Sequence, residues 1–173
     1  FCDRCGGKII DSSIVNNYLP EMNQIAKNRP KPTFIFDQRP VTIETTINRV
    51  LFIQAKEDLK GKDIVVVGDD DLTSLALGLT RLPNKIVVFD IDDRLIGFIR
   101  KISEEKNLKI KTYRIDLTEG VPKKLFGKFD VFVTDPTPKK DPFDLFISIG
   151  LSLLKDGKGY SGYISFFPSH QEI

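Results

Sequence analysis

Short apolar runs that alternate with helical stretches constrain the fold of this chain more than any other feature. Runs such as DIVVV at 63–67 and KIVVFD at 85–90 lack polar alternation, which is typical of strands buried in a parallel sheet. Helical periodicity fills the segments between them. The predicted strands cover 63–67, 85–90, 108–115, 129–134 and 160–167, and the predicted helices cover 72–82, 93–107 and 142–154. This alternation predicts βαβ units and a parallel α/β sheet.

The N-terminal part of the chain has a different character. A helix is expected over 43–59 and a short strand over 34–38. Residues 1–35 show no sustained periodicity and end in the stretch NRPKPTF, which predicts a linker or the tail of a preceding domain. We therefore expect a core domain over 36–173 and a short N-terminal appendage. Because the chain begins with Phe1 and its expected sheet stops after about five strands, we expect a truncated fragment of a longer protein.

Composition excludes several classes of protein. The chain has 173 residues, of which 40% are hydrophobic and 29% charged, an ordinary balance for a globular domain. No apolar stretch approaches the roughly 18 residues that cross a bilayer, so no membrane association is expected. No secretory signal is visible, which favours the cytoplasm. A net charge of +2 gives no electrostatic case for nucleic acid as a partner.

The chain has two cysteines, Cys2 and Cys5, in the segment FCDRCGGK. Their spacing resembles half of a zinc ribbon, but a structural zinc site needs two more ligands. The one histidine, His170, is far away in the sequence. A redox pair and two ordinary thiols are the alternatives. Cys2 and Cys5 are therefore weak candidates for zinc, and no metal is expected for catalysis.

Carboxylates follow each of the first four predicted strands. In an open parallel sheet, ligands bind outside the carboxyl ends of the strands. Each acid alone has a structural explanation, such as a turn or a helix cap. Together they favour a functional site, because carboxylates that repel one another destabilise a fold unless a ligand uses them. The groups at these strand ends are Gly68, Asp69, Asp70, Asp71, Asp90, Asp116 and Asp135.

The turn after the first strand disfavours a cofactor that carries phosphate. A dinucleotide site needs G-x-G-x-x-G, whereas this turn has one glycine followed by three acids. From Asp63 to Asp93 there are seven Asp and two basic residues, a balance that attracts cations. Asp90 lies 22 residues after Gly68, which matches an acid that binds ribose hydroxyls. A nucleoside cofactor with a cationic sulfonium, such as S-adenosylmethionine or a relative of it, fits this pattern.

The segments GDDDLTSLAL, FDIDDRL, YRIDL and FDVFVTDP, in this order and spacing, resemble the Rossmann-like class I S-adenosylmethionine-dependent transferases. With FDQRPVTIETTINR at 36–49 and KGYSGYISF at 158–166, the set resembles the branched-chain polyamine synthases, the N(4)-bis(aminopropyl)spermidine synthases. CDRCGGK is similar to the Cys pair before that family's catalytic domain. The resemblance implies aminopropyl transfer from decarboxylated S-adenosylmethionine to an internal amine of spermidine. It also places the catalytic aspartate within GDDD. The sequence DPTP departs from the DPP that is more frequent in the relatives.

This hypothesis assigns roles to individual residues. Asp70 is the expected base and amine anchor. Asp69 and Asp71 share the electrostatic work, with Asp69 as an alternative cofactor contact and Asp71 as a second amine contact. Asp135 is expected to contact the amine or the aminopropyl group. The expected cofactor contacts are Gly68, Asp69, Asp90 with the ribose, Ile91 with the adenine, Asp116 with the adenine amino group, and Leu117 beside it. Phe36 and Asp37 are expected to close the pocket. The expected partner is a polyamine such as spermidine. A homodimer with a second copy of the chain is an open alternative to a monomer.

Two other functions stay open at this point. An N-methyltransferase is the first, because DPTP is related to the (D/N)PP(Y/F) loop, although Lys139 stands where an aromatic residue is expected. The second is a phosphoacceptor receiver domain, which VVVGDDD and FDVFVTDPTP resemble. Against it, Asp70 and Asp135 are 65 residues apart, and no Lys follows the fifth strand. A magnesium site at 69–71 is a further alternative.

Overall fold

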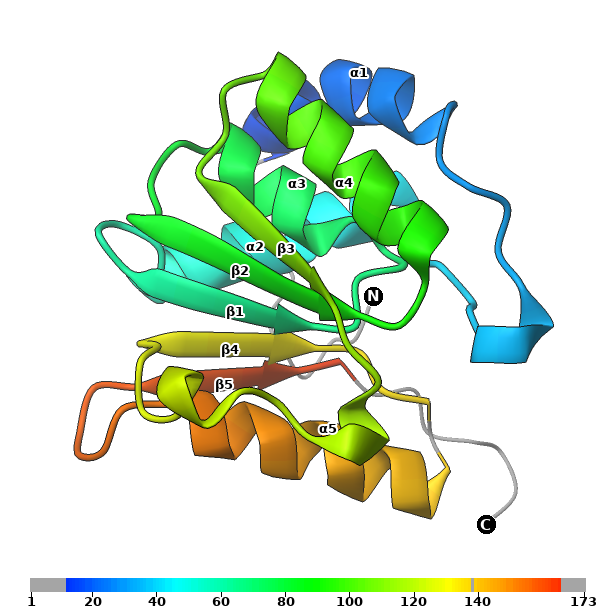
Figure 1. The fold of residues 1–173 in the computed structure, drawn as a ribbon. Helices are drawn as coiled ribbons and strands as arrows, with labels where there is room; N and C mark the ends of the chain where they lie inside the picture. The colour runs from blue at the N-terminus through cyan, green and yellow to red at the C-terminus, as the bar shows by residue number, and fades with distance from the viewer. Residues whose placement is uncertain (1–11, 138, 166–173) are drawn as a thin grey trace, which may run out of the picture.

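Five parallel strands form one sheet in a computed structural model that describes residues 12–137 and 139–165 (Figure 1). The strand order is β3-β2-β1-β4-β5, and every neighbouring pair is parallel. The strands are β1 (Asp63–Val67), β2 (Lys85–Asp90), β3 (Ile110–Arg114), β4 (Val131–Thr134) and β5 (Ser161–Ile164). The predicted parallel α/β sheet is therefore confirmed.

The strand order also excludes one of the two alternative functions that the sequence left open. The chain runs outward from β1 through β2 to β3, and then returns to place β4 on the other side of β1. Dinucleotide-binding folds have this order, whereas receiver domains of the CheY type have the order 2-1-3-4-5. The receiver alternative is therefore wrong. The order reverses between β1 and β4, so the ligand-binding crevice is expected at their carboxyl ends.

Helices cover both faces of the sheet. Figure 1 shows α1 to α4 on one face and α5 on the other. The helices are α1 (Ser12–Ala26), α2 (Ile43–Ala55), α3 (Thr73–Leu79), α4 (Asp93–Glu105) and α5 (Lys140–Leu153), with short 3-10 helices η1 (Phe34–Phe36), η2 (Leu117–Glu119) and η3 (Lys123–Leu125). None of the helices in the described part of the chain is both long and apolar enough to cross a membrane.

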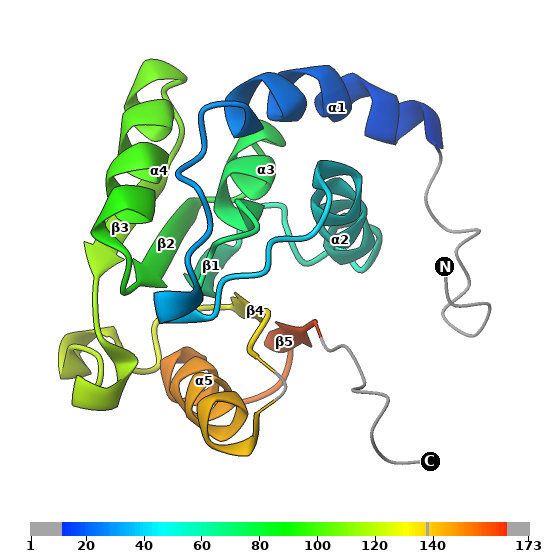
Figure 2. The ribbon, with the colours of Figure 1, turned by 90° about the vertical axis from the view of Figure 1, so that its right-hand side faces the viewer.

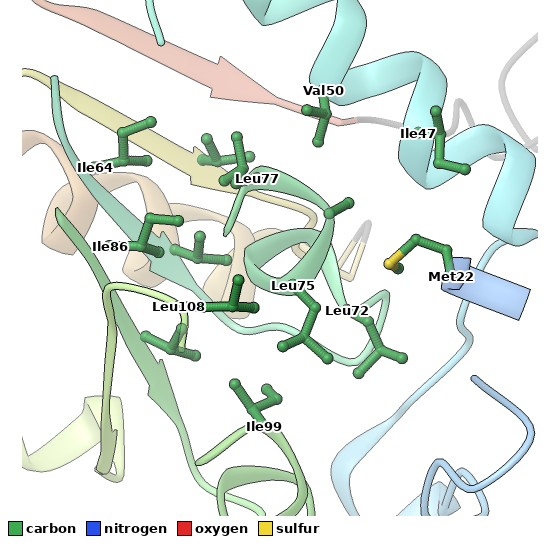
Figure 3. Close-up of a cluster of buried hydrophobic side chains, with 14 of the residues drawn as sticks. Met22, Ile47, Val50, Ile64, Leu72, Leu75, Leu77, Ile86, Ile99 and Leu108 are labelled. Carbon is green, nitrogen blue, oxygen red and sulfur yellow. The ribbon is translucent and has the colours of Figure 1, made fainter. Parts of the chain in front are cut away.

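The strands are apolar on both faces because each face has its own core. Successive side chains of a strand point to opposite faces. Ile64 and Val66 of β1 therefore pack under α1 to α4 (Figure 3), whereas Val65 and Val67 pack against α5. All four side chains are fully buried or nearly so. The uninterrupted run DIVVV thus reflects a strand covered from both sides.

The N-terminal segment corrects two expectations. Residues 1–35 are predicted to be a linker or the tail of a preceding domain, but Ser12–Ala26 forms α1 and buries Met22 and Ile25 in the core shared with α2 and α3. A linker without structure is therefore wrong for these residues, whereas the boundary at residue 35 stays a prediction. Pro20 and three asparagines weaken the helical pattern of α1, so tertiary burial stabilises it rather than intrinsic propensity. The Cys2 and Cys5 pair lies outside the described residues.

The strand predicted over 34–38 is also wrong, because this stretch forms η1. The side chain of Thr33 accepts a hydrogen bond from the backbone of Ile35, and Asp37 ends the turn with a φ of 51°. Local side-chain bonding of this kind competes with strand pairing. The other predicted elements lie at the expected places with ends shifted by a few residues. The predicted end of the fifth strand, residues 166 and 167, lies outside the described residues.

Gly150 provides a test of how tightly α5 packs on the sheet. A Cβ at Gly150 would lie 2.5 Å from the ring of Phe132, which is buried in β4. Overpacking of this kind costs about 1–3 kcal/mol, more than the ~1 kcal/mol that Ala adds to a helix. We expect Gly150→Ala to lower Tm by roughly 2–6 °C. Thermal unfolding followed by circular dichroism measures this.

Gly97 is the matched control for Gly150. It is exposed in α4, and a Cβ there would meet no atom within 4 Å. Gly97→Ala should therefore stabilise the protein by about 0.5–1 kcal/mol. Equal stabilisation by both substitutions would contradict the packing of α5 described here.

Candidate active site

The segment that joins α1 to α2, residues 27–42, crosses in front of the carboxyl ends of the strands (Figure 2). Its backbone is bonded to the turn after β1. The N–H of Arg39 donates to Oδ2 of Asp70 over 3.0 Å, and the N–H of Val41 donates to Oδ1 of Asp71 over 2.7 Å. The crossing segment, as we call residues 27–42, therefore forms one wall of the acidic site.

Two side chains also tie the crossing segment to the ends of β2 and β4. Gln38 Nε2 donates to Oδ2 of Asp92 over 3.0 Å. Oδ2 of Asp37 accepts from Thr137 Oγ1 over 2.9 Å and from Lys139 Nζ over 3.1 Å, which lowers the pKa of Asp37. Asp37 thus links the crossing segment to the residues after β4, and its role in closing the pocket stays a prediction. The crossing segment is therefore hydrogen-bonded to the residues that follow β1, β2 and β4.

Asp69 is the most enclosed acid of the turn, with 2% of its surface exposed. Its carboxylate accepts from the N–H of Ser74 over 3.1 and 3.3 Å and from the Ser74 hydroxyl. Burial raises its pKa well above the usual range, in spite of these bonds. Asp69 therefore anchors the start of α3, because Leu72, at the N-cap position, gives no side-chain bond. A direct role in substrate or cofactor binding stays a prediction for this residue.

Arg49 of α2 joins two carboxylates across the point where the strand order reverses. Nη1 pairs with Oδ2 of Asp71 after β1, and Nη2 pairs with Oδ2 of Asp135 after β4 over 2.7 Å. Asp71 is buried, whereas 32% of the Asp135 side chain is exposed. Burial and the neighbouring Asp71 raise the pKa of Asp135 to about 6, and Arg49 opposes this rise. The predicted acids Asp71 and Asp135 therefore do meet in space.

Asp70 has the properties expected of a base. Burial, followed by the charge of Asp71, raises its pKa to about 7. Oδ2 carries the bond from the Arg39 backbone, and Oδ1 has no hydrogen-bond partner among the described residues. Asp70 also lines a cavity between the crossing segment and the strand ends. The other residues that line this cavity are Arg29, Pro30, Pro32, Gln38, Pro40, Asp92 and Leu95. A carboxylate with a pKa near the working pH and a free oxygen can exchange a proton.

Asp90 connects two of the turns at this end of the sheet. Its Oδ2 accepts from the N–H of Asp69 and its Oδ1 from the N–H of Asp92, both over 2.9 Å. Burial raises the pKa of Asp90. Each carboxylate oxygen can accept a second bond, so ribose binding stays a prediction. Ile91, the predicted adenine contact, is half-buried next to it.

Asp116 and Leu117 follow β3, the third strand in the same row. Oδ1 of Asp116 accepts from the N–H of Thr118 over 2.9 Å and from its hydroxyl over 2.7 Å, which lowers the pKa of Asp116. The carboxylate therefore caps η2. A cap of this kind is enough to explain an acid at this position without a ligand. Leu117 is buried in the core under α5. Neither role excludes the predicted adenine contacts, which stay predictions.

Gly68 is required by the backbone at the end of β1. Its φ is +72°, and a Cβ would lie 2.8 Å from the ring of Phe146 in α5. Because Gly68 has no side chain, the backbone at this position can approach Phe146 closely. The predicted approach of the same backbone to a cofactor stays a prediction. Phe36, expected to help close the pocket, lies at the exposed tip of the crossing segment with Phe34 and Ile35, which are 91% and 85% exposed.

The three acids of the turn point to different partners, so they do not form a metal site. Among residues 12–137 and 139–165, no group of three or more His, Cys, Asp or Glu side chains could hold a metal ion. The magnesium alternative at 69–71 therefore lacks a ligand set in the described part of the chain.

The most important residue that the sequence did not single out is Arg49. A lone Arg on an amphipathic helix gives no signal of its own, because its partners are fixed by the sheet. Its one sequence signal is its place at the end of FDQRPVTIETTINR. The sequence also did not single out Asp92 as the N-cap of α4. Asp92 accepts from the N–H and side chain of Arg94, and Arg94 is the main cause of its pKa of about 2.

Residues 17–172 match the family of the branched-chain polyamine synthase A C-terminal domain. The N(4)-bis(aminopropyl)spermidine synthase of Methanocaldococcus jannaschii is 44% identical to the chain over 163 residues. This match covers 94% of the chain and 46% of that relative. The chain thus spans about half the length of the curated relatives it matches.

Solved structures agree with this match. The branched-chain polyamine synthase of Thermus thermophilus, in complex with N4-aminopropylspermidine and 5′-methylthioadenosine, is 37% identical with a TM-score of 0.80. The match covers 87% of the present chain and 42% of that chain. A proposed RNA methyltransferase from Pyrococcus horikoshii has a TM-score of 0.62 at 13% identity, over 78% of the present chain and 69% of the other. At this identity the likeness shows a shared Rossmann-like fold alone.

The raised pKa of Asp70 predicts a pH-dependent stability. Its pKa is about 7 in the folded protein and about 3.9 in an unfolded chain. The folded state therefore binds more protons between these values, and stability is lost as the pH rises through about 7. Asp70→Asn keeps a neutral group at every pH. We expect it to raise the free energy of unfolding by roughly 1–3 kcal/mol at pH 8 and by little at pH 4.

Urea unfolding of both proteins between pH 4 and pH 8 measures this difference. Asp156→Asn, an exposed change in the loop between α5 and β5, is the matched control and should leave the pH dependence as it is. Parallel curves for the wild type and Asp70→Asn would show that Asp70 has an ordinary pKa.

Proposed function

The chain belongs to the family of the branched-chain polyamine synthase A C-terminal domain, and on this premise we propose that the protein is an aminopropyltransferase of polyamine biosynthesis. The proposed donor is decarboxylated S-adenosylmethionine, and the proposed acceptor is an internal amine of a polyamine such as spermidine. The observation that carries the proposal is Asp70, a half-buried carboxylate with a pKa of about 7 and a free oxygen at the switch point of the sheet.

The acidic strand ends suit a cationic acceptor. Amines of the lysine type titrate near pH 10, so spermidine carries about three positive charges at neutral pH. Asp70, Asp71 and Asp135 surround the switch point, and Arg49 is the one cation that forms an ion pair with any of these three in the described residues. A site of this charge attracts and orients a polyamine.

The chemical step needs a base and good alignment. The attacking amine must lose a proton, because an ammonium has no lone pair. Its nitrogen then forms a bond to the propyl carbon next to the sulfonium, the carbon–sulfur bond breaks, and its electron pair goes to sulfur. The products are 5′-methylthioadenosine, the extended polyamine, and a proton that Asp70 accepts and passes to solvent. A positioned base contributes about 10²–10⁴ in rate, and alignment supplies more.

The donor is proposed to lie along the row of strand ends from β1 to β3. Its sulfonium is positive and it carries no phosphate, which suits a turn with three acids. We propose that Gly68 borders the donor, that Asp90 binds the ribose hydroxyls, and that Ile91 packs on the adenine. Asp116 is proposed to accept from the adenine amino group, with Leu117 beside it. Oδ2 of Asp116 has no partner within the described ranges and is free for this bond.

The three carboxylates of the turn have different proposed roles. Asp70 is the base and amine anchor. Asp71 and Asp135 provide negative charge beside the amine, and Asp135, the more exposed of the two, contacts the amine or the aminopropyl group. Asp69 is proposed to hold the start of α3 in place. A contact between Asp69 and the cofactor is the secondary proposal. The homodimer and the cytoplasmic location stay predictions.

Asp70→Asn tests the proposed base. We expect the release of 5′-methylthioadenosine, measured with decarboxylated S-adenosylmethionine and spermidine, to fall by about 10²–10⁴. The matched control is Asp156→Asn, at the opposite end of the sheet, which should keep the wild-type rate. Undiminished turnover in Asp70→Asn would remove Asp70 from the mechanism.

The same assay, analysed by mass spectrometry with a mixture of polyamines, tests the proposed reaction. Products that gain one or two aminopropyl groups are the expected result. Methylated products, together with tighter binding of S-adenosylmethionine than of its decarboxylated form, would favour the N-methyltransferase alternative instead.

A further inference from the structure

Arg49 lies where a cation is least expected in a site for a polycation. It projects from α2 toward the carboxyl ends of β1 and β4, and 21% of its side chain is exposed. One turn earlier on α2, the hydroxyl of Thr46 donates to the backbone oxygen of Asp71 over 3.0 Å. The helix is therefore fixed to the turn beside the guanidinium. A permanent positive charge here reduces the attraction for an amine, so its presence calls for another explanation.

The geometry of the contact favours arginine over lysine. The two Nη atoms of Arg49 serve two carboxylates that belong to different strands, Asp71 after β1 and Asp135 after β4. A guanidinium offers five donors in a rigid planar fork, whereas an ammonium is a point charge. Asp71 receives a second bond from the N–H of Val41, so both of its oxygens are occupied. Asp71 is thus held by α2 and by the crossing segment, whereas Oδ1 of Asp70 accepts no bond from the described residues.

The guanidinium of Arg49 affects the site by balancing the charges of Asp71 and Asp135. Two carboxylates that share a small space do not both ionise at neutral pH unless a cation balances them. With Arg49 in place, Asp71 and Asp135 together with the guanidinium carry one net negative charge. Without it, the two acids would share a proton and carry the same net charge. The guanidinium therefore replaces a mobile proton by a fixed cation.

We propose that Arg49 is a positioning residue that divides the work among the carboxylates of the site. By binding Asp71 and Asp135 together, it keeps both ionised and in place, and it leaves Asp70 as the one acid of the turn that exchanges a proton with the amine. The division of work rests on the proposed function, whereas the ionisation of the pair does not.

The pair has several charged neighbours that remain the same when Arg49 is changed. They are Asp69 and Asp70 on the turn, Asp90 at the end of β2, Arg29, Asp37 and Arg39 on the crossing segment, and Lys139 before α5. A comparison of each variant with the wild type at the same pH therefore isolates the effect of the guanidinium.

The first test uses Arg49→Met and needs no substrate. Arg49 opposes the raised pKa of Asp135, so loss of the fork raises that pKa further above its unfolded value, and the variant loses stability relative to the wild type as the pH rises through the neutral range. We expect its Tm to lie within about 3 °C of the wild type at pH 5 and roughly 4–10 °C below it at pH 8. Arg81→Met is the control. Arg81 donates to the backbone at the end of α4, so its loss should give the same difference at both pH values.

The second test measures turnover of the proposed reaction against pH. For Arg49→Met we expect kcat to fall by about 10- to 100-fold at pH 7 with a smaller change in KM, and to recover as the pH approaches 9 and the shared proton is lost. Arg49→Lys keeps the charge and should regain part of kcat at pH 7. A merely structural role would lower kcat by the same factor at every pH.

The two tests separate this inference from the proposed function. Absence of aminopropyl transfer by the wild type would remove the proposed function and the division of work, whereas the Tm arm would still decide the ionisation of the pair. A Tm difference that is constant from pH 5 to pH 8, or a pH–rate profile of unchanged shape, would overturn the role of Arg49.

Discussion

The ion pairs of Arg49 with Asp71 and Asp135 are the contacts on which the acidic site depends. A parallel sheet brings all its carboxyl ends to one side, so any acids that follow the strands must share a small space. Here one guanidinium and the backbone N–H groups of Arg39 and Val41 balance the acids nearest the switch point. The site is therefore a product of three segments that are separate in sequence: residues 27–42, α2 and the strand ends.

The three acids of GDDD have different contacts because they differ in surroundings. Asp69 is buried against Ser74 and serves α3, Asp71 is bound on both oxygens, and Asp70 keeps one oxygen free. These different environments are the basis for the three different roles that we propose for carboxylates on consecutive residues. Asp69 and Asp71 are buried and Asp70 between them is only half-buried, a difference that the repeated letter in the sequence does not reveal.

The sheet was predictable because its strands are covered on both sides, so the apolar runs at 63–67 and 85–90 have one interpretation. The acids at four strand ends were predictable for the same topological reason. Helix α1 was missed because Pro20 and its asparagines obscure a pattern that burial stabilises. Arg49 and the amides of the crossing segment were missed because a backbone N–H leaves no mark in sequence, and because the partners of a lone arginine depend on tertiary structure.

The bond from the Arg39 N–H to Asp70 has a consequence for the order of events during turnover. A hydrogen bond to a carboxylate is roughly twice as strong as one to a neutral group. When Asp70 takes up a proton from the amine, the crossing segment would lose part of its attachment to the turn, before the amine nitrogen forms its new bond. The proton goes to the free Oδ1, whereas the Arg39 N–H is bonded to Oδ2 of the same carboxylate. The attachment of this wall of the site would therefore be weaker while Asp70 holds the proton and return to full strength when the proton passes to solvent.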